Sequence, residues 1–304
     1  MDTISICICT HNRREELKRC LSSIASQDNL VDLTEVLVID NASTDGTTEW
    51  LENEAMGSFP VRLRTVFEPR LGIAIARNRG FAEIESHIII WIDDDVTLRP
   101  GFIEAHARAF SLPNTALTGG RIFPCFPEGT PDEVRVLFDV KYGGPAAGYD
   151  FGEESLVIGL SNGDIHSVPI GANFGLLKAA VKEPKPFDES LGWGKRWVPG
   201  EETELFLRLL RKGKIARYVP EAMVDHHLST RRLNMDYYLK WWLGQGRSEL
   251  YTTERRPLLH LLSSLKEIIT LNMRLRLAKD DLTRNATRGQ LARSKGRILE
   301  ALGR

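Results

Sequence analysis

The chain has 304 residues, of which 42% are hydrophobic and 27% charged. This composition indicates a soluble globular protein with one large domain or two smaller ones, and it excludes disordered and fibrous chains. Forty basic and 41 acidic side chains leave a formal net charge of -1, which argues against a globally basic, nucleic-acid-binding protein. The charge is uneven: residues 255–304 hold 12 Lys and Arg against 4 Asp and Glu, a net of +8, which leaves -9 for residues 1–254.

The cysteines and the apolar segments bear on the cellular setting. Cys7, Cys9, Cys20 and Cys125 have neither the CxxC spacing of zinc sites nor the density of a disulfide scaffold. The N-terminus does not resemble a signal peptide, and no apolar run reaches the roughly 20 residues that span a bilayer. We therefore expect a cytoplasmic protein.

The first 92 residues predict strands that alternate with helices. Strands are expected at residues 5–9, 35–39, 61–67 and 87–92, and helices at 15–26, 47–54 and 74–84. Helical spacing is clearest where Leu17, Cys20, Leu21 and Ile24 recur at i, i+3, i+4 and i+7. This alternation predicts an α/β fold with a Rossmann-like, mostly parallel sheet flanked by helices, which gathers ligands at the carboxyl ends of its strands.

The remaining two thirds of the chain are less regular. Residues 119–165 are rich in Gly, Pro and aromatic residues, which predicts a variable insertion. Order is expected to return at 168–178, followed by a helix at 201–212, a strand at 214–219 and a helical tail from Met235.

Polar residues follow the predicted strands: Thr10 and Asn12 after the first, Asp40 after the second, and Asp93 to Asp95 after the fourth. The turn from Thr10 to Arg14 contains no glycine. A dinucleotide-binding fingerprint and a Walker loop both need glycine there, so neither a nicotinamide-dependent enzyme nor a P-loop enzyme is expected.

Three aspartates directly follow the apolar strand at residues 88–92. In an extended segment, Asp93 and Asp95 would point the same way and share one ligand. Hard carboxylate oxygens at a strand end suit Mg²⁺ or Mn²⁺ bridging a diphosphate. The alternative is a capped strand end without a metal; the sequence favours metal binding.

Six segments together resemble the family 2 glycosyltransferases over about residues 3–228. They are Thr10–Arg13, Val38–Gly46, Gly72–Gly80, Trp91–Asp95, Gly171–Phe174 and Gly200–Leu205. The resemblance implies a GT-A fold, a metal-dependent nucleotide-sugar donor and inversion at the anomeric carbon. It also implies a catalytic domain at 1–230, with a donor half at about 1–118 and an acceptor half at about 119–230. A basic helical extension would then occupy 231–304.

The resemblance assigns the donor side. The Thr10 turn and Asp40 would hold the base and ribose, Asp93 would contact the ribose hydroxyls, Asp95 would ligate the metal, and Arg77 would contact the base or the diphosphate. Asp40 can instead cap its turn, and Arg77 can instead lie on a helix surface beside Glu83 or Glu85. The predicted donor-binding residues are Thr10, Asn12, Arg13, Asp40, Asn41, Arg77, Asp93 and Asp94.

The resemblance also assigns the acceptor side. The family's usual Glu-Asp pair corresponds to Glu201-Glu202, which makes Glu202 the general base and Glu201 its catalytic neighbour. Both acids also begin a helix, where they can simply complement its dipole. The residues predicted to contact the acceptor or the sugar are Gly171, Ala172, Asn173 and Trp193. Trp193 can instead pack in the core.

His226 aligns with a family position that completes the metal coordination, although His227 is adjacent and a structural histidine is equally compatible with the sequence. In the tail, Leu258, Leu262, Leu265, Ile269 and further apolar residues recur at helical spacing among cations. Such a basic amphipathic helix within 255–304 can lie on an anionic membrane, pack on the catalytic domain or form a homodimer contact.

The sequence thus predicts an inverting glycosyltransferase that uses Mn²⁺ or Mg²⁺. We expect a nucleotide-sugar donor, with UDP favoured, and a glycan or lipid-linked acceptor in glycan or polysaccharide synthesis. Two alternatives stay open: a nucleotidyltransferase, which usually has a Gly-rich phosphate loop, and a sugar-nucleotide-binding protein without turnover.

Overall fold

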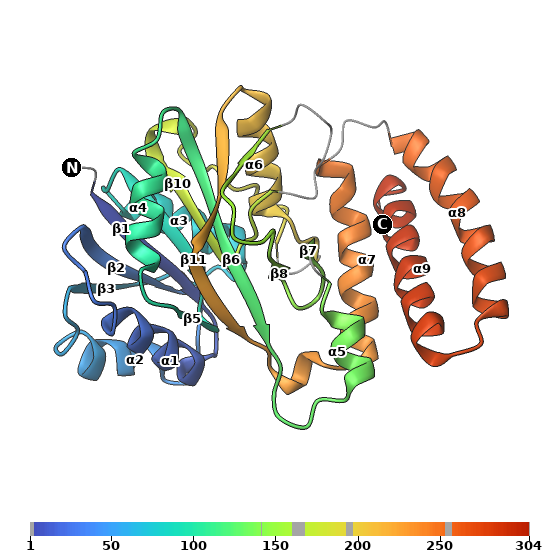
Figure 1. Cartoon of the computed structure of the whole chain (residues 1–304), viewed down its shortest axis with the longest axis horizontal. Helices are drawn as coiled ribbons and strands as arrows, with labels where there is room; N and C mark the ends of the chain where they lie inside the picture. Colours follow the sequence, from blue (N-terminus) through green and yellow to red (C-terminus); the bar gives the residue numbers. More distant parts are fainter. Residues whose placement is uncertain (1–2, 141, 160–167, 193–196, 253–256, 304) are drawn as a thin grey trace.

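The computed structural model describes residues 3–303 except 141, 160–167, 193–196 and 253–256. Within this part, the chain forms one α/β layer structure, in which helices flank a central sheet and three further helices stack at one end (Figure 1). None of the described helices is long and apolar enough to cross a membrane. The predicted α/β fold is confirmed.

The first 93 residues contain every element that their periodicity predicts. Four strands alternate with helices: β1 Ile4–Thr10, α1 Arg14–Ala25, β2 Leu33–Asp40, α2 Thr47–Trp50, β3 Arg62–Phe67, α3 Ile73–Glu83 and β4 Ile88–Asp93. The helix predicted at 47–54 begins as α2 and continues as a π-helical turn over Leu51–Ala55. The four strands pair in parallel in the order β3-β2-β1-β4, so their carboxyl ends share one edge.

The sheet continues with strands of mixed direction. β10 Asn173–Leu177 runs antiparallel between β4 and β6 Thr115–Cys125, and β11 Ile215–His227 pairs in parallel with β6. Around them lie β5 Val96–Leu98, α4 Phe102–Phe110, α5 Asp132–Phe138, β7 Tyr142–Gly143, β8 Gly148–Tyr149, β9 Leu156–Ile158 and α6 Glu201–Arg211. The four strands predicted to pair in parallel do so, and the direction becomes mixed only from β10 onward.

Two predicted boundaries are wrong. The proposed insertion begins with the second half of β6, a strand inside the sheet, because Gly119 and Gly120 look like a loop in the sequence. A Cβ at Gly119 would lie 2.7 Å from Pro169 Cβ, and a Cβ at Gly120 would collide with the Ala222 carbonyl, so both glycines serve close packing. The strand predicted to end at 219 continues past Pro220 to His227 through a register shift.

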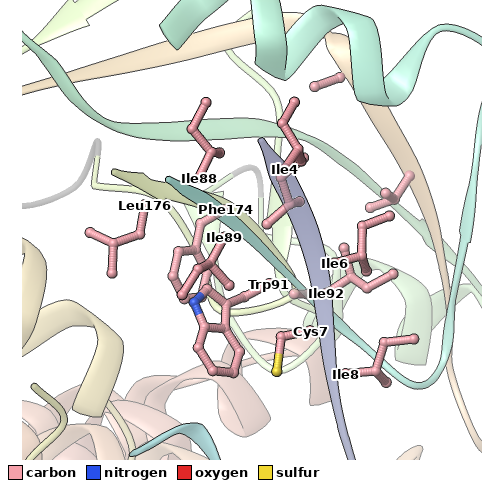
Figure 2. Close-up of a cluster of buried hydrophobic side chains, with 14 of the residues drawn as sticks. Ile4, Ile6, Cys7, Ile8, Ile88, Ile89, Trp91, Ile92, Phe174 and Leu176 are labelled. Atoms are coloured by element: carbon pink, nitrogen blue, oxygen red, sulfur yellow. The ribbon is translucent and has the colours of Figure 1, made fainter. Parts of the chain in front are cut away.

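The main core lies at β4 and its neighbours. All five residues from Ile88 to Ile92 are buried, which their unbroken apolar run predicts for a strand covered on both faces. The Trp91 ring packs 6.1 Å from Phe174 and 5.6 Å from Phe187, between centroids. Figure 2 shows Trp91 beside Phe174, with Cys7 of the adjoining strand below. This buried, tightly packed strand positions the aspartates that follow it.

Three helices form the C-terminal part: α7 Met235–Thr252, α8 Pro257–Leu277 and α9 Asp281–Ala301. α7 contacts α6, α9 packs along α7, and α8 packs on α9, which leaves α8 outermost (Figure 1). The predicted helical tail is confirmed.

Candidate active site

A pocket of about 900 Å³ opens at the carboxyl ends of β1, β2 and β4, between the sheet and α7. The parallel strands bring the segments after them to this edge, as the fold geometry predicts. Most of the predicted site residues line the pocket: Thr10, Arg13, Asn41, Arg77, Asp93, Asp94, Gly171, Ala172, Glu201, Glu202 and His226.

The three aspartates Asp93, Asp94 and Asp95 have different positions and different partners in the site. Asp93 ends β4, and the chain turns at Asp94 and Asp95, so the extended i, i+2 arrangement expected for Asp93 and Asp95 is not found. Arg13 joins the other two, with its guanidinium 2.9 Å from Asp94 Oδ1 and 2.6 Å from Asp95 Oδ2. Thr10 Oγ1 donates to Asp94 Oδ2 at 2.7 Å. Burial raises the pKa of Asp94 to about 7, although Arg13 acts to lower it.

Asp95 is buried behind the residues that line the pocket, where it faces His226, which does line it. His226 Nε2 lies 3.3 Å from Asp95 Oδ1, and Arg232 Nη1 lies 3.5 Å from Asp95 Oδ2. Burial alone would raise the pKa of Asp95, but His226 and Arg13 hold it well below its usual value. His226 Nδ1 lies 2.9 Å from the carbonyl oxygen of Ala146, which only accepts, so Nδ1 carries a proton and Nε2 faces the carboxylate.

This pair fits a divalent cation. Asp95 Oδ1 and His226 Nε2 are buried and face each other at 3.3 Å, and neither makes a hydrogen bond to any other group in the described structure. Carboxylate oxygen and imidazole nitrogen are suitable Mn²⁺ ligands, and the carbonyl that fixes the His226 tautomer is a common support for a metal-binding histidine. Among the described residues, no three His, Cys, Asp or Glu side chains form a complete metal site. Further ligands would have to come from water or from a bound phosphate.

Arg77 links the two halves of the pocket. Its guanidinium contacts Glu201 Oε1 at 2.5 Å, Glu202 Oε2 at 3.5 Å and Asp93 Oδ1 at 3.8 Å, and it donates to the Gly171 carbonyl at 3.2 Å. The side chain is 5% exposed. The alternative that Arg77 lies on a helix surface is therefore wrong.

The two glutamates that share Arg77 differ in access to the pocket. The Glu201 side chain is 3% exposed and that of Glu202 is 17% exposed. Burial, together with the charge of Glu202, raises the pKa of Glu201 to about 8 against the opposing effect of Arg77. Glu202 is thus the carboxylate that a ligand can reach, while Glu201 anchors the arginine.

Two residues predicted on the donor side are directed elsewhere. Asp40 is fully buried, and its carboxylate accepts from the Ser43 amide at 3.0 Å and from the Thr48 hydroxyl. This is the turn-capping alternative, and the predicted contact of Asp40 with the base and ribose is not supported. Asn12 lies in an exposed turn, where its Oδ1 accepts from the Thr44 amide at 2.7 Å.

Asn41 lines the pocket, but its side chain bonds to backbone groups of a neighbouring segment. Its side chain donates to the carbonyls of Glu68 and Arg70 at 3.1 and 2.8 Å, and it accepts from the Gly72 amide at 2.8 Å. These bonds hold the segment from 68 to 72 against the end of β2.

The predicted acceptor residues also separate. Gly171 and Ala172 line the pocket. Asn173 does not, because it is fully buried in the sheet and bonded to His106 and to the Ala222 carbonyl. The prediction that Asn173 contacts an acceptor is therefore not supported. Trp193 lies outside the described residues.

The sequence interpretation missed one whole wall of the pocket. α7 contributes Tyr237, Trp241 and Trp242, and Trp197 packs beside them with its ring 6.0 Å from that of Tyr237. Lys240 Nζ lies 3.1 Å from the centre of the Trp197 ring. The density of aromatic residues around Trp241 was the available signal, but only the tertiary packing of α7 brings it to the pocket.

Comparison with known proteins gives relatives of one kind. A pre-mycofactocin glycosyltransferase of Mycobacterium tuberculosis is 25% identical over 256 residues, covering 84% of this chain and 47% of the relative. Glycosyltransferase AglE of Haloferax volcanii is 27% identical over 126 residues, 41% of each chain. The chain thus spans less than half the length of these two relatives. A glucosyl-dolichyl phosphate glucuronosyltransferase of Haloferax volcanii is 23% identical, covering 80% of this chain and 76% of the relative.

Solved structures share the fold. The mannosyltransferase PcManGT from Pyrobaculum calidifontis, in complex with GDP-Man and Mn²⁺, superposes with a TM-score of 0.66 at 15% identity, covering 98% of this chain and 87% of that one. GalNAc-T7 with UDP, GalNAc and Mn²⁺ gives a TM-score of 0.56 at 16% identity, covering 80% and 47%. These likenesses establish a GT-A fold. The model of the family described as Glycosyl transferase family 2 matches residues 5–178, more than half of the chain, and the protein is therefore a member of glycosyltransferase family 2.

Proposed function

We propose that this glycosyltransferase is an inverting, metal-assisted enzyme in which Glu202 is the general base. The observation that carries the proposal is the contrast between the two glutamates on Arg77. Both line the pocket, but the Glu201 side chain is 3% exposed and lies against the guanidinium, whereas that of Glu202 is 17% exposed and keeps a longer contact of 3.5 Å. Arg77 thereby fixes the carboxylate of Glu202 on the rim without enclosing it.

We propose a nucleotide-sugar donor, with UDP as the favoured nucleotide, on the side of the pocket formed by Thr10, Arg13, Asn41, Asp93 and Asp94. The similar structures that contain UDP or GDP-Man support this class of donor. Arg13 is exposed enough to reach a ligand, with 21% of its side chain accessible. A phosphate group is a natural partner for a guanidinium at this position.

Asp95 and His226 are the residues that would hold Mn²⁺ or Mg²⁺, and Mn²⁺ in two similar structures supports a divalent ion. The ion would supply charge stabilisation for the departing diphosphate. The chain's own contribution is to place both ligand atoms, with the Ala146 carbonyl and Arg13 fixing their orientation.

Glu202 would accept the proton of the acceptor hydroxyl as its oxygen attacks the anomeric carbon. The bond from that carbon to the nucleoside diphosphate breaks on the opposite face, so the configuration inverts. A positioned carboxylate typically contributes about 10²- to 10⁴-fold to such a step. The aromatic wall of Trp197, Trp241 and Trp242 would receive the acceptor, a glycan or lipid-linked molecule in a glycan or polysaccharide pathway on the cytoplasmic side.

The test combines donor binding and turnover. Thermal or urea unfolding is measured with UDP or GDP in the presence of Mn²⁺, Mg²⁺ or EDTA. Turnover is measured as hydrolysis of the matching sugar nucleotide, in which water replaces the unknown acceptor. At about 100 times its dissociation constant, a nucleotide should stabilise the fold by roughly 2.7 kcal/mol, only with metal. Asp95→Asn should abolish this stabilisation.

Glu202→Gln should keep the metal-dependent stabilisation and lose about 10²- to 10⁴-fold in turnover. Glu204→Gln is the matched control, because Glu204 lies on the same helix turn but pairs with Arg208 at 3.0 Å. Unchanged turnover in Glu202→Gln would remove Glu202 as the base. Nucleotide binding without any turnover in the wild type would favour a binding protein instead.

A further inference from the structure

The outermost helix, α8, presents its apolar side to solvent. Apolar side chains at positions 258, 262, 265, 269, 273 and 277 recur every three or four residues, so they share one face of the helix. Their exposed fractions run from 47% to 74%. The residues of this outer face are Leu258, Leu259, Leu262, Leu265, Ile269, Met273 and Leu277.

The side of α8 that packs on the protein is comparatively polar. His260 and Ser264 are buried there together with Leu271. Glu267 on the same side bonds Ser294 Oγ at 3.0 Å and pairs with Arg297 of α9. A helix on the surface of a soluble protein normally has the opposite arrangement, with its apolar face toward the core and its polar face toward water. Single exposed leucines are ordinary, but a continuous face of seven marks an interaction surface.

Its dimensions indicate a helix that would lie along a surface. Twenty-one residues at 1.5 Å each make α8 about 30 Å long, and the outer face extends over this whole length. The helix is nevertheless not apolar enough to cross a bilayer. The buried polar side and the ion pair to α9 hold it on the protein, so the outer face alone is available to a partner.

The charges around the outer face are almost all positive. Lys266, Arg274 and Arg276 are exposed on α8. The one acidic residue of the helix, Glu267, forms an ion pair with Arg297 of α9. Residues 257–303 contain 9 Lys and Arg against 4 Asp and Glu, a net of +5. A second copy in antiparallel pairing would set Lys266 against Lys266 with no carboxylate on the face to offset it. A negatively charged partner is complementary.

We propose that the outer face of α8 binds the surface of a bilayer that contains anionic lipids, with the helix axis in the membrane plane. The apolar side chains would enter the boundary between headgroups and acyl chains, and the flanking cations would contact lipid phosphates. The proposal rests on α8 alone and is independent of the proposed catalytic chemistry.

Vesicle flotation with the full chain tests this. We expect the wild type to float with vesicles of phosphatidylcholine and phosphatidylglycerol, and to bind pure phosphatidylcholine on the order of 100-fold more weakly, because each Lys or Arg near an anionic surface contributes about a factor of five. The combined variant Leu262→Gln, Leu265→Gln, Ile269→Gln should lose more than 100-fold in partition. Glutamine is a good helix former, so α8 should persist.

A matched control replaces three exposed apolar residues elsewhere, Val31→Gln, Leu112→Gln and Val157→Gln, which are 88%, 47% and 63% exposed. This control should float like the wild type. Equal flotation of the α8 variant, or failure of the wild type to bind anionic vesicles, would overturn the proposal. Light scattering without lipid gives a further test. If the wild type is a dimer and the α8 variant is a monomer, the outer face binds a second copy of the chain and the membrane proposal is wrong.

Discussion

Asn173 shows how a residue predicted at the acceptor instead stabilises the sheet. His106 Nε2 lies 3.1 Å from Asn173 Oδ1, and His106 Nδ1 lies 2.8 Å from Thr118 Oγ1. Because the Asn173 amide nitrogen donates to the Ala222 carbonyl at 2.9 Å, its oxygen faces His106 and must accept. Nε2 therefore carries a proton, and in the neutral imidazole Nδ1 accepts from the Thr118 hydroxyl. Burial lowers the pKa of His106 to about 4.

This histidine makes the fold sensitive to acid. In the unfolded chain it binds a proton near pH 6.5, and in the folded protein only near pH 4. Between these values the unfolded state binds more protons, so stability falls as the pH falls. A difference of 2.5 pH units corresponds to about 3 kcal/mol. We expect urea unfolding to show that loss between pH 7 and pH 4 and His106→Gln to escape it. Parallel pH profiles for both proteins would contradict the assignment.

The residues at strand ends were predictable because an apolar run that stops at a polar residue marks the edge of the sheet. Thr10 and Asp93 follow this rule and line the pocket. The partners of Arg77 were not predictable in the same way, since Glu201 is 124 positions away and meets it only when the folded sheet brings α3, which packs on β1 and β2, close to α6, which packs on β11. Asp40 also lies at the end of an apolar strand, but its carboxylate is hydrogen-bonded within the following turn and does not line the pocket.

At the scale of elements, glycine allows α7 and α9 to approach closely. A Cβ added at Gly246 of α7 would collide with the Arg293 carbonyl of α9, and one added at Gly296 of α9 would collide with the Leu243 carbonyl of α7. The two helices therefore touch backbone to backbone. This contact fixes α7, which carries the aromatic wall of the pocket.

Gly246→Ala separates two opposing effects. Helix propensity alone should make the alanine variant more stable by about 1 kcal/mol. The collision with α9 should outweigh this gain and leave the variant less stable than the wild type by about 1 to 3 kcal/mol. We expect a lower denaturant midpoint and faster hydrogen exchange in α7 and α9. Gly57→Ala is the control, because a Cβ there meets no atom within 4 Å. A stabilised Gly246→Ala protein would show that the helices can move apart freely.

Elements were predicted best where one period dominates. The amphipathic helix α1 and the buried strand β4 carry unambiguous patterns, and both were found. β6 and β11 were truncated in the prediction because Gly119, Gly120 and Pro220 are local breaking signals. In the folded chain, packing partners that are distant in sequence override those signals.

For the molecule as a whole, a second apolar cluster joins the C-terminal helices to the body. Leu137 and Phe138 of α5 pack with Leu228 and with Tyr238 of α7, and the rings of Phe138 and Tyr238 lie 5.5 Å apart. The predicted boundary at residue 230 therefore passes through shared packing. The larger cluster around β1 and β4 lies elsewhere and underlies the side of the pocket where we propose that the donor binds.

Two core truncations, one in each cluster, measure how independently the parts unfold. Phe138 and Phe102 are 1% and 0% exposed, so either change to alanine should cost about 3 to 5 kcal/mol. Phe138→Ala should speed hydrogen exchange in α5, α7 and α9 while β1 to β4 stay protected, and it should leave nucleotide-dependent stabilisation intact. Phe102→Ala should instead loosen the sheet and weaken that stabilisation. If both variants raise exchange equally everywhere, the two clusters unfold as one cooperative unit, and the acceptor wall cannot loosen without the donor side.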